Sequence, residues 1–116
     1  MAAKRRARSR SSRPESANDV DRLLEQTILS VLRERAARAG AGAAPTICPS
    51  DAARALFVEE RVWRAHMERA RAAARRLVAQ GRLEITQRGK LVDPDHARGP
   101  IRLRLPRDLQ SIVRNL

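Results

Sequence analysis

Four arginines share one side of a helix that the sequence predicts over residues 61–80. The apolar residues of this segment recur at intervals of four, three, four and three, which places them in one stripe along a helix. Guanidinium groups on the opposite side could fork to guanine edges or to phosphate oxygens, so this basic face is a candidate for binding nucleic acid; the alternative is a solvated helix surface. The stripe is Trp63, Met67, Ala70, Ala74 and Leu77, and the basic face is Arg61, Arg64, Arg71 and Arg75.

Cys48 is the one nucleophile that could carry chemistry. At a helix N-terminus its thiol could be nucleophilic, with His66 as a partner, but a small buried or capping side chain is the favoured interpretation. No Gly-rich phosphate loop, paired-histidine site or catalytic triad can be assembled, and one cysteine with two histidines excludes a disulfide framework and a zinc site. We expect no catalytic residue, no metal and no cofactor.

The charge of the chain indicates a polyanionic partner. Its 116 residues contain 25 Lys and Arg against 13 Asp and Glu, a formal charge of +12 with an isoelectric point near 11.7. GC-rich coding explains a preference for Arg over Lys but not the scarcity of acids. The apolar stretches are short and interrupted by arginine, so we expect a cytoplasmic protein with no membrane segment.

The N-terminal residues 1–17 form a basic arm. The arm has six basic residues against Glu15 and no aromatic or β-branched residue, so it is expected to be disordered. Arg5 and Arg6 are candidates for contacting phosphates, the alternative being a solubility tail.

Three helices are predicted after the arm. The first begins at Asn18 and ends before Gly40, and the second runs from Pro49 to about Phe57 after a short strand at Thr46 and Ile47. A turn at residues 58–60 leads to the helix over 61–80, and two helices joined so closely indicate a helix-turn-helix.

A hairpin and a final short helix complete the prediction. Alternating residues 83–86 lead through a tight turn at Arg88 and Gly89 into residues 90–92, and residues 101–105 form the clearest strand, with 93–100 as a turn or wing between them. The last segment, 106–116, is an amphipathic helix that docks on the core or, alternatively, forms a dimer contact. The basic residues expected to steady phosphates here are Arg82, Arg88, Lys90, Arg102 and Arg104.

Several short motifs together resemble a family of small bacterial proteins of unknown function. The resemblance covers about residues 20–105 and implies a winged-helix-like fold, while it supplies no activity and no site residue. The helix over 61–80 is long for a recognition helix, so its first half is expected to meet a groove. The motifs are CPSDAAR (48–54), WRAHM (63–67), QGRL (80–83), TQRG (86–89), VDP (92–94) and GPIRL (99–103).

The sequence therefore predicts a mostly α protein with a small β wing (α+β): a disordered arm at 1–17, a single winged helix-turn-helix-like domain at 18–105 and a C-terminal helix at 106–116. Its expected function is binding nucleic acid, most simply double-stranded DNA, through the basic face, the wing and the arm. The alternatives are a protein-interaction adaptor and a thiol-based redox protein built on Cys48.

Overall fold

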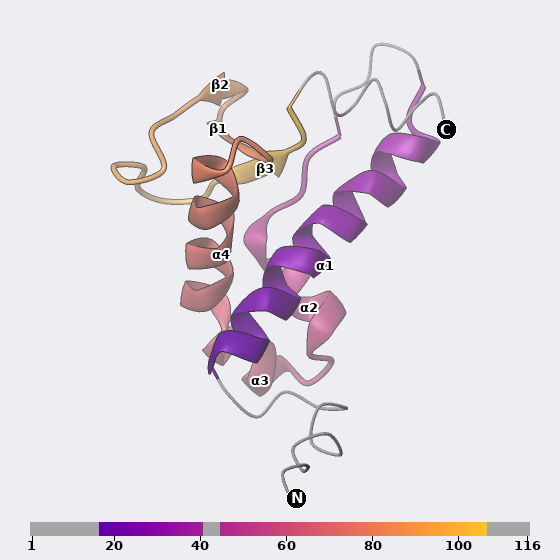
Figure 1. Ribbon diagram of the computed structural model, residues 1–116, viewed down its shortest axis with the longest axis vertical. Helices are drawn as coiled ribbons and strands as arrows, with labels where there is room; N and C mark the ends of the chain where they lie inside the picture. Colours follow the sequence, from indigo (N-terminus) through magenta and orange to yellow (C-terminus); the bar gives the residue numbers. More distant parts are fainter. Residues whose placement is uncertain (1–16, 41–44, 107–116) are drawn as a thin grey trace, which may run out of the picture.

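The computed structural model describes residues 17–40 and 45–106, and within them it has four helices followed by a small antiparallel sheet (Figure 1). The fold class is α+β, as the sequence predicts. The arm, up to residue 16, and the C-terminal helix, from residue 107, lie outside the described residues. The elements are α1 (Ala17–Arg38), α2 (Pro49–Leu56), α3 (Glu60–Ala65), α4 (Met67–Ala79), β1 (Glu84–Gln87), β2 (Lys90–Leu91) and β3 (Arg102–Arg104).

The core lies where α1 and α2 pack against α4. The side of α4 that faces inward is made mainly of alanine, so the neighbouring helices can approach closely. Larger residues of α1 fill the space beside these alanines, and the sheet covers the remaining end of the core (Figure 1). The buried residues of α4 are Ala70, Ala73, Ala74 and Leu77, and the fully buried leucines and isoleucine of α1 are Leu24, Ile28 and Leu32.

The sheet has the strand order β2-β1-β3 with antiparallel pairing throughout. Ile85 lies opposite Leu103, both are buried, and the arginines of β3 alternate with buried residues as predicted. The strand expected at residues 46–47 is reduced to a bridge in which Ile47 exchanges two backbone hydrogen bonds with Leu103, at 2.9 and 2.7 Å.

The β1–β2 hairpin is closed by the predicted two-residue turn. Arg88 has φ +53° and Gly89 has φ +80°, the signs that a type I′ turn requires at its two central positions. The left-handed region costs glycine nothing but strains arginine, so Arg88 holds a conformation for which its side chain is poorly suited.

The prediction of one continuous helix over 61–80 is wrong. The chain turns at His66, which has φ −104° and ψ 10° and separates α3 from α4. In a continuous helix the backbone N–H of His66 would donate to the carbonyl oxygen of Val62. Here the side-chain Nδ1 of His66 donates to that oxygen, at 2.8 Å, and the backbone N–H bonds to the carbonyl oxygen of Trp63 instead. The ring also stacks on Phe57, with centroids 4.2 Å apart, so a contact with the end of α2 accompanies the break.

Trp63, the first residue of the apolar stripe predicted for this segment, does not lie in the core. Its side chain is half-buried and lies outside the buried cluster, and α3 has no buried residue. The guanidinium carbons of Arg54 and Arg64 lie 4.5 and 5.1 Å from the centre of its ring. Trp63 is therefore a surface aromatic residue in contact with two cations.

Candidate nucleic-acid interface

A hollow of about 800 Å³ lies between the β1–β2 hairpin and the loop over residues 92–101. Four of its lining side chains are cationic and exposed, and none is acidic. We call this surface the basic hollow. It brings together three predicted site residues from two strands and a turn, and its lining consists of Gln87, Arg88, Lys90, Leu91, Val92, Arg98, Pro100 and Arg102.

The loop at the rim of the basic hollow is held from two sides. From β1, Nε2 of Gln87 donates to the carbonyl oxygens of Arg98 at 2.6 Å and Pro100 at 3.1 Å. From α4, Nη2 of Arg71 donates to the carbonyl oxygen of Gly99 at 2.8 Å. Three consecutive carbonyl groups of the loop are thus bound, and Arg71 joins the basic side of α4 to the hollow.

The other three arginines of the predicted basic face are separated from the hollow or share their charge with acids. On α3, Arg64 forms an ion pair of 2.6 Å with Glu60, and exposed Arg61 directly follows Glu60 in the chain. On α4, Arg75 lies 3.5 Å from Glu68, an exposed carboxylate. α3 thus has one acid against two arginines, and Arg71 is the member of this set that reaches the hollow.

Two arginines that the sequence predicts to contact phosphates are bonded to other side chains of the domain. Arg104 donates from Nε to Oε1 of Glu84 at 2.8 Å across the β1–β3 pair, so its charge is offset by a neighbouring acid. Arg82 donates to the side-chain oxygen of Gln80 at 3.3 Å. Arg102 lines the hollow while its guanidinium also bonds to Thr46, at 3.0 Å to Oγ1 and 3.2 Å to the carbonyl oxygen.

Sequence reasoning missed Arg98 and Gln87. Arg98 is the only Lys or Arg within 93–100, a segment predicted to be a turn or wing, so its charge alone could have marked it. The role of Gln87 depends on a fold-back of eleven residues that no local pattern reports.

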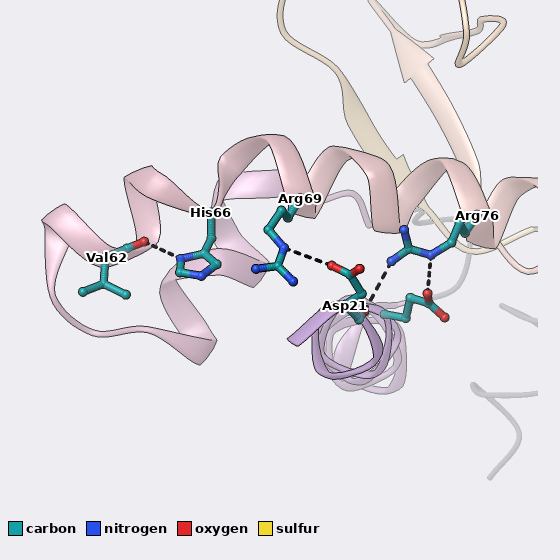
Figure 2. A network of polar contacts seen from close by, with 6 residues as sticks. Asp21, Val62, His66, Arg69 and Arg76 are labelled. Atoms are coloured by element: carbon teal, nitrogen blue, oxygen red, sulfur yellow. Dashed lines mark hydrogen bonds and ion pairs between the residues drawn. The ribbon is translucent and has the colours of Figure 1, made fainter. Parts of the chain in front are cut away.

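Two partly buried ion pairs fix α4 on α1 and add no charge to the interface. In Figure 2, the side chains of Arg69 and Arg76 point from α4 toward α1, which is seen along its axis. Arg69 lies 3.1 Å from Asp21, and Arg76 lies 2.5 Å from Glu25. These two arginines stabilise the packing of the helices and are less available to a ligand.

Cys48 occupies the N-cap of α2 and is half-buried. Its backbone N–H donates to Oδ2 of Asp51 at 3.0 Å, and its Sγ lies 2.8 Å from Oγ of Ser50. His66, the partner considered from the sequence, bonds to Val62 and stacks on Phe57. Within residues 17–40 and 45–106 no three His, Cys, Asp or Glu side chains gather in a way that could hold a metal.

Next to the hollow, loop 92–101 contains an exposed histidine that contacts a carboxylate. Nδ1 of His96 lies 2.6 Å from Oδ2 of Asp93, and the backbone N–H of Asp95 donates to Asp93 at 2.9 Å. The hydrogen bond from Asp95, followed by that from His96, lowers the pKa of Asp93. The carboxylate in turn raises the pKa of His96. The loop therefore gains a positive charge on His96 more readily than an isolated histidine would.

A family model described as a protein of unknown function (DUF3253) matches residues 21–106. The chain belongs to this family. The match begins in the first turns of α1 and passes the end of β3, so it includes the basic hollow and excludes Arg5 and Arg6 of the arm. A comparison with curated proteins found no match. No helix in the described part of the chain is long and apolar enough to cross a membrane.

Proposed function

We propose that the protein binds duplex nucleic acid, with DNA as the preferred duplex, through the basic hollow and the adjoining side of α4. The observation that carries the proposal is the distribution of charge. Arg88, Lys90 and Arg98 are exposed and form no ion pair with any described residue, whereas most arginines of α3 and α4 lie beside acids. Clustered cations that form no ion pair attract a phosphate backbone.

The order of the elements supports this proposal. The described chain has, in order, a helix, a bridge at Ile47, the helices α2 to α4 and a β hairpin with a long loop. This order is compatible with a winged-helix domain, in which loop 92–101 would be the wing. Such domains place one helix in the major groove and the wing on the backbone. Because Arg71 joins α4 to the wing, both could contact one duplex.

The test is equilibrium binding of the full chain to labelled mixed-sequence DNA and RNA duplexes at several salt concentrations. We expect micromolar or tighter binding at low salt, with log K falling steeply as log salt rises. An affinity that does not depend on salt, or no binding at low salt, contradicts the proposal. Measuring both duplexes decides between DNA and RNA.

A protein-interaction adaptor is the second candidate, favoured by the exposed residues around α3. Val58 is 92% exposed in the turn between α2 and α3, and the half-buried Trp63 lies on α3 itself. Apolar side chains on this surface are typical of protein contacts. A partner bound here would be displaced by Val58→Asp, which should leave duplex binding unchanged.

A further inference from the structure

The basic hollow combines cations with an apolar lining. Leu91, 61% exposed, lies with Val92 and Pro100 among the cationic side chains. The backbone of a nucleic-acid strand also combines charged and less polar groups, because a sugar lies between each pair of phosphates. A surface that carried cations alone would suit any small anion, whereas apolar groups beside them favour a ligand with an apolar part.

The hollow is also preformed. Its loop is fixed through the carbonyl groups of residues 98–100 by Gln87 and Arg71, so little ordering entropy remains to be lost when a ligand binds. Gly99, at φ +83°, provides the bend that presents these carbonyl groups to their donors. Arg88 places its charge at the rim of the hollow although its backbone is left-handed, a conformation that glycine or asparagine adopts at a lower energetic cost.

We propose that the basic hollow grips the backbone of one nucleic-acid strand, with neighbouring phosphates on Arg88, Lys90 and Arg98 and the intervening sugar on Leu91 and Pro100. This inference rests on the proposed function, which it deepens by naming the part of the ligand that enters the site. Gln87 is a positioning residue that holds the loop without supplying charge. The ligand chemistry is that of phosphate groups, and a free nucleotide is the other source that could supply it.

The test compares Lys90→Gln and Arg98→Gln with Arg33→Gln, a matched removal of one charge from an exposed position on α1. Each hollow variant should bind a mixed-sequence duplex about three- to tenfold more weakly and lower the slope of log K against log salt by about one. Arg33→Gln should change the affinity less than twofold, a bound for an uncontacted charge. Equal effects of all three variants would show only general electrostatic attraction and would overturn the inference.

Gln87→Ala separates the shape of the hollow from its charge. It removes no cation, so duplex binding should weaken about threefold or more while the salt slope stays unchanged. A parent-like affinity in a folded Gln87→Ala variant would contradict preorganisation. Leu91→Asn, which keeps all cations, should likewise weaken duplex binding, and an unchanged affinity would argue against the sugar contact.

Amide chemical shifts of the full chain, titrated with duplex, adenosine diphosphate or tripolyphosphate, separate this inference from the proposed function. Shifts at residues 87–102 with duplex at the lowest concentrations support both. Duplex binding that leaves these residues unshifted overturns the inference alone. Failure to bind duplex, with shifts here from adenosine diphosphate, overturns the proposed function and assigns the phosphate site to free nucleotides. No shift with any of the three probes overturns both.

Discussion

Nη2 of Arg71 lies 2.8 Å from the carbonyl oxygen of Gly99, and this hydrogen bond fastens α4 to the loop that borders the basic hollow. The two residues are separated by 28 positions in the chain, so the contact depends on the completed fold. It makes one surface of two basic segments that appear separate in the sequence.

Arg71→Gln should loosen this loop while the core stays intact. The shorter amide cannot reach as far as the guanidinium. The amide protons of His96 and Ala97, which bond to the carbonyl oxygen of Asp93 in this loop, should therefore exchange faster, while those of α1 and α4 keep their protection. Hydrogen exchange followed by NMR measures both. Unchanged protection in the loop would mean that Gln87 alone is enough to hold it.

Arg88→Asn should separate stability from binding. Asparagine tolerates the left-handed conformation and with Gly89 forms a favoured type I′ turn, so the free energy of unfolding should be unchanged or rise by up to about 1 kcal/mol. Duplex affinity should fall, because a hollow cation is lost. Chemical denaturation and anisotropy measure the two effects, and a loss of stability with parent-like binding would contradict both expectations.

Arg76→Met should destabilise the contact between α1 and α4. The guanidinium pairs with Glu25, which is only 22% exposed, and its loss leaves a poorly solvated carboxylate. Because Arg76 is itself 38% exposed, the cost should be only about 1–2 kcal/mol. Arg33→Met on the solvated side of α1 is the control, and we expect it to stay within about 0.5 kcal/mol of the parent in urea denaturation.

Leu103→Ala should destabilise the domain more than Trp63→Ala, although leucine has the smaller side chain. Leu103 is fully buried between Ile85 and Ile47, so its truncation should cost about 2–5 kcal/mol. Trp63 is half-buried outside the core cluster and its ring contacts two arginines, so its loss should cost about 1–2 kcal/mol and leave the domain folded. Thermal unfolding ranks the two variants, and an unfolded Trp63→Ala chain would restore the tryptophan to the core.

His96 should titrate above its ordinary pKa of 6.5, because Asp93 favours the protonated ring. A raised folded pKa means that the stabilisation from the pair is fully present below pH 6.5 and is lost as the pH rises through the folded value. In NMR titrations the midpoint of His96 should fall in the Asp93→Asn variant. A midpoint that does not respond to this substitution would show that the pair does not form in solution.

The elements that the sequence predicts correctly are those with a strong local period or turn signal. The extent of α1, the start of α2 and the Arg88-Gly89 turn are set by residues close together in the chain. The break at His66 was missed because no glycine or proline marks it. It coincides with a side-chain bond to Val62 and a stack on Phe57, contacts that local periodicity does not report.

The candidate site was predicted as a set of charges but not as an arrangement. Sequence alone identified Arg88, Lys90 and Arg102, whose basic character is independent of the fold. It could not tell them from Arg104, because the pairing of Arg104 with Glu84 depends on the β1–β3 register. Nor could it assign Gln87 its place, since the two carbonyl groups that it binds lie more than ten residues away.

The alanines of α4 have a structural role in the core, although GC-rich coding alone would make alanine frequent. Ala70, Ala73 and Ala74 have no exposed surface, and each presents a single methyl group to the core that α4 shares with α1 and α2. These methyl groups act as spacers that set the distance between the helices. The sheet follows α4 after a short turn at Gly81, so a bulkier side chain at any of the three positions would push α4 outward and displace the hairpin with it. The geometry of the basic hollow is thus set partly by the small side chains of the helix from which Arg71 reaches its loop.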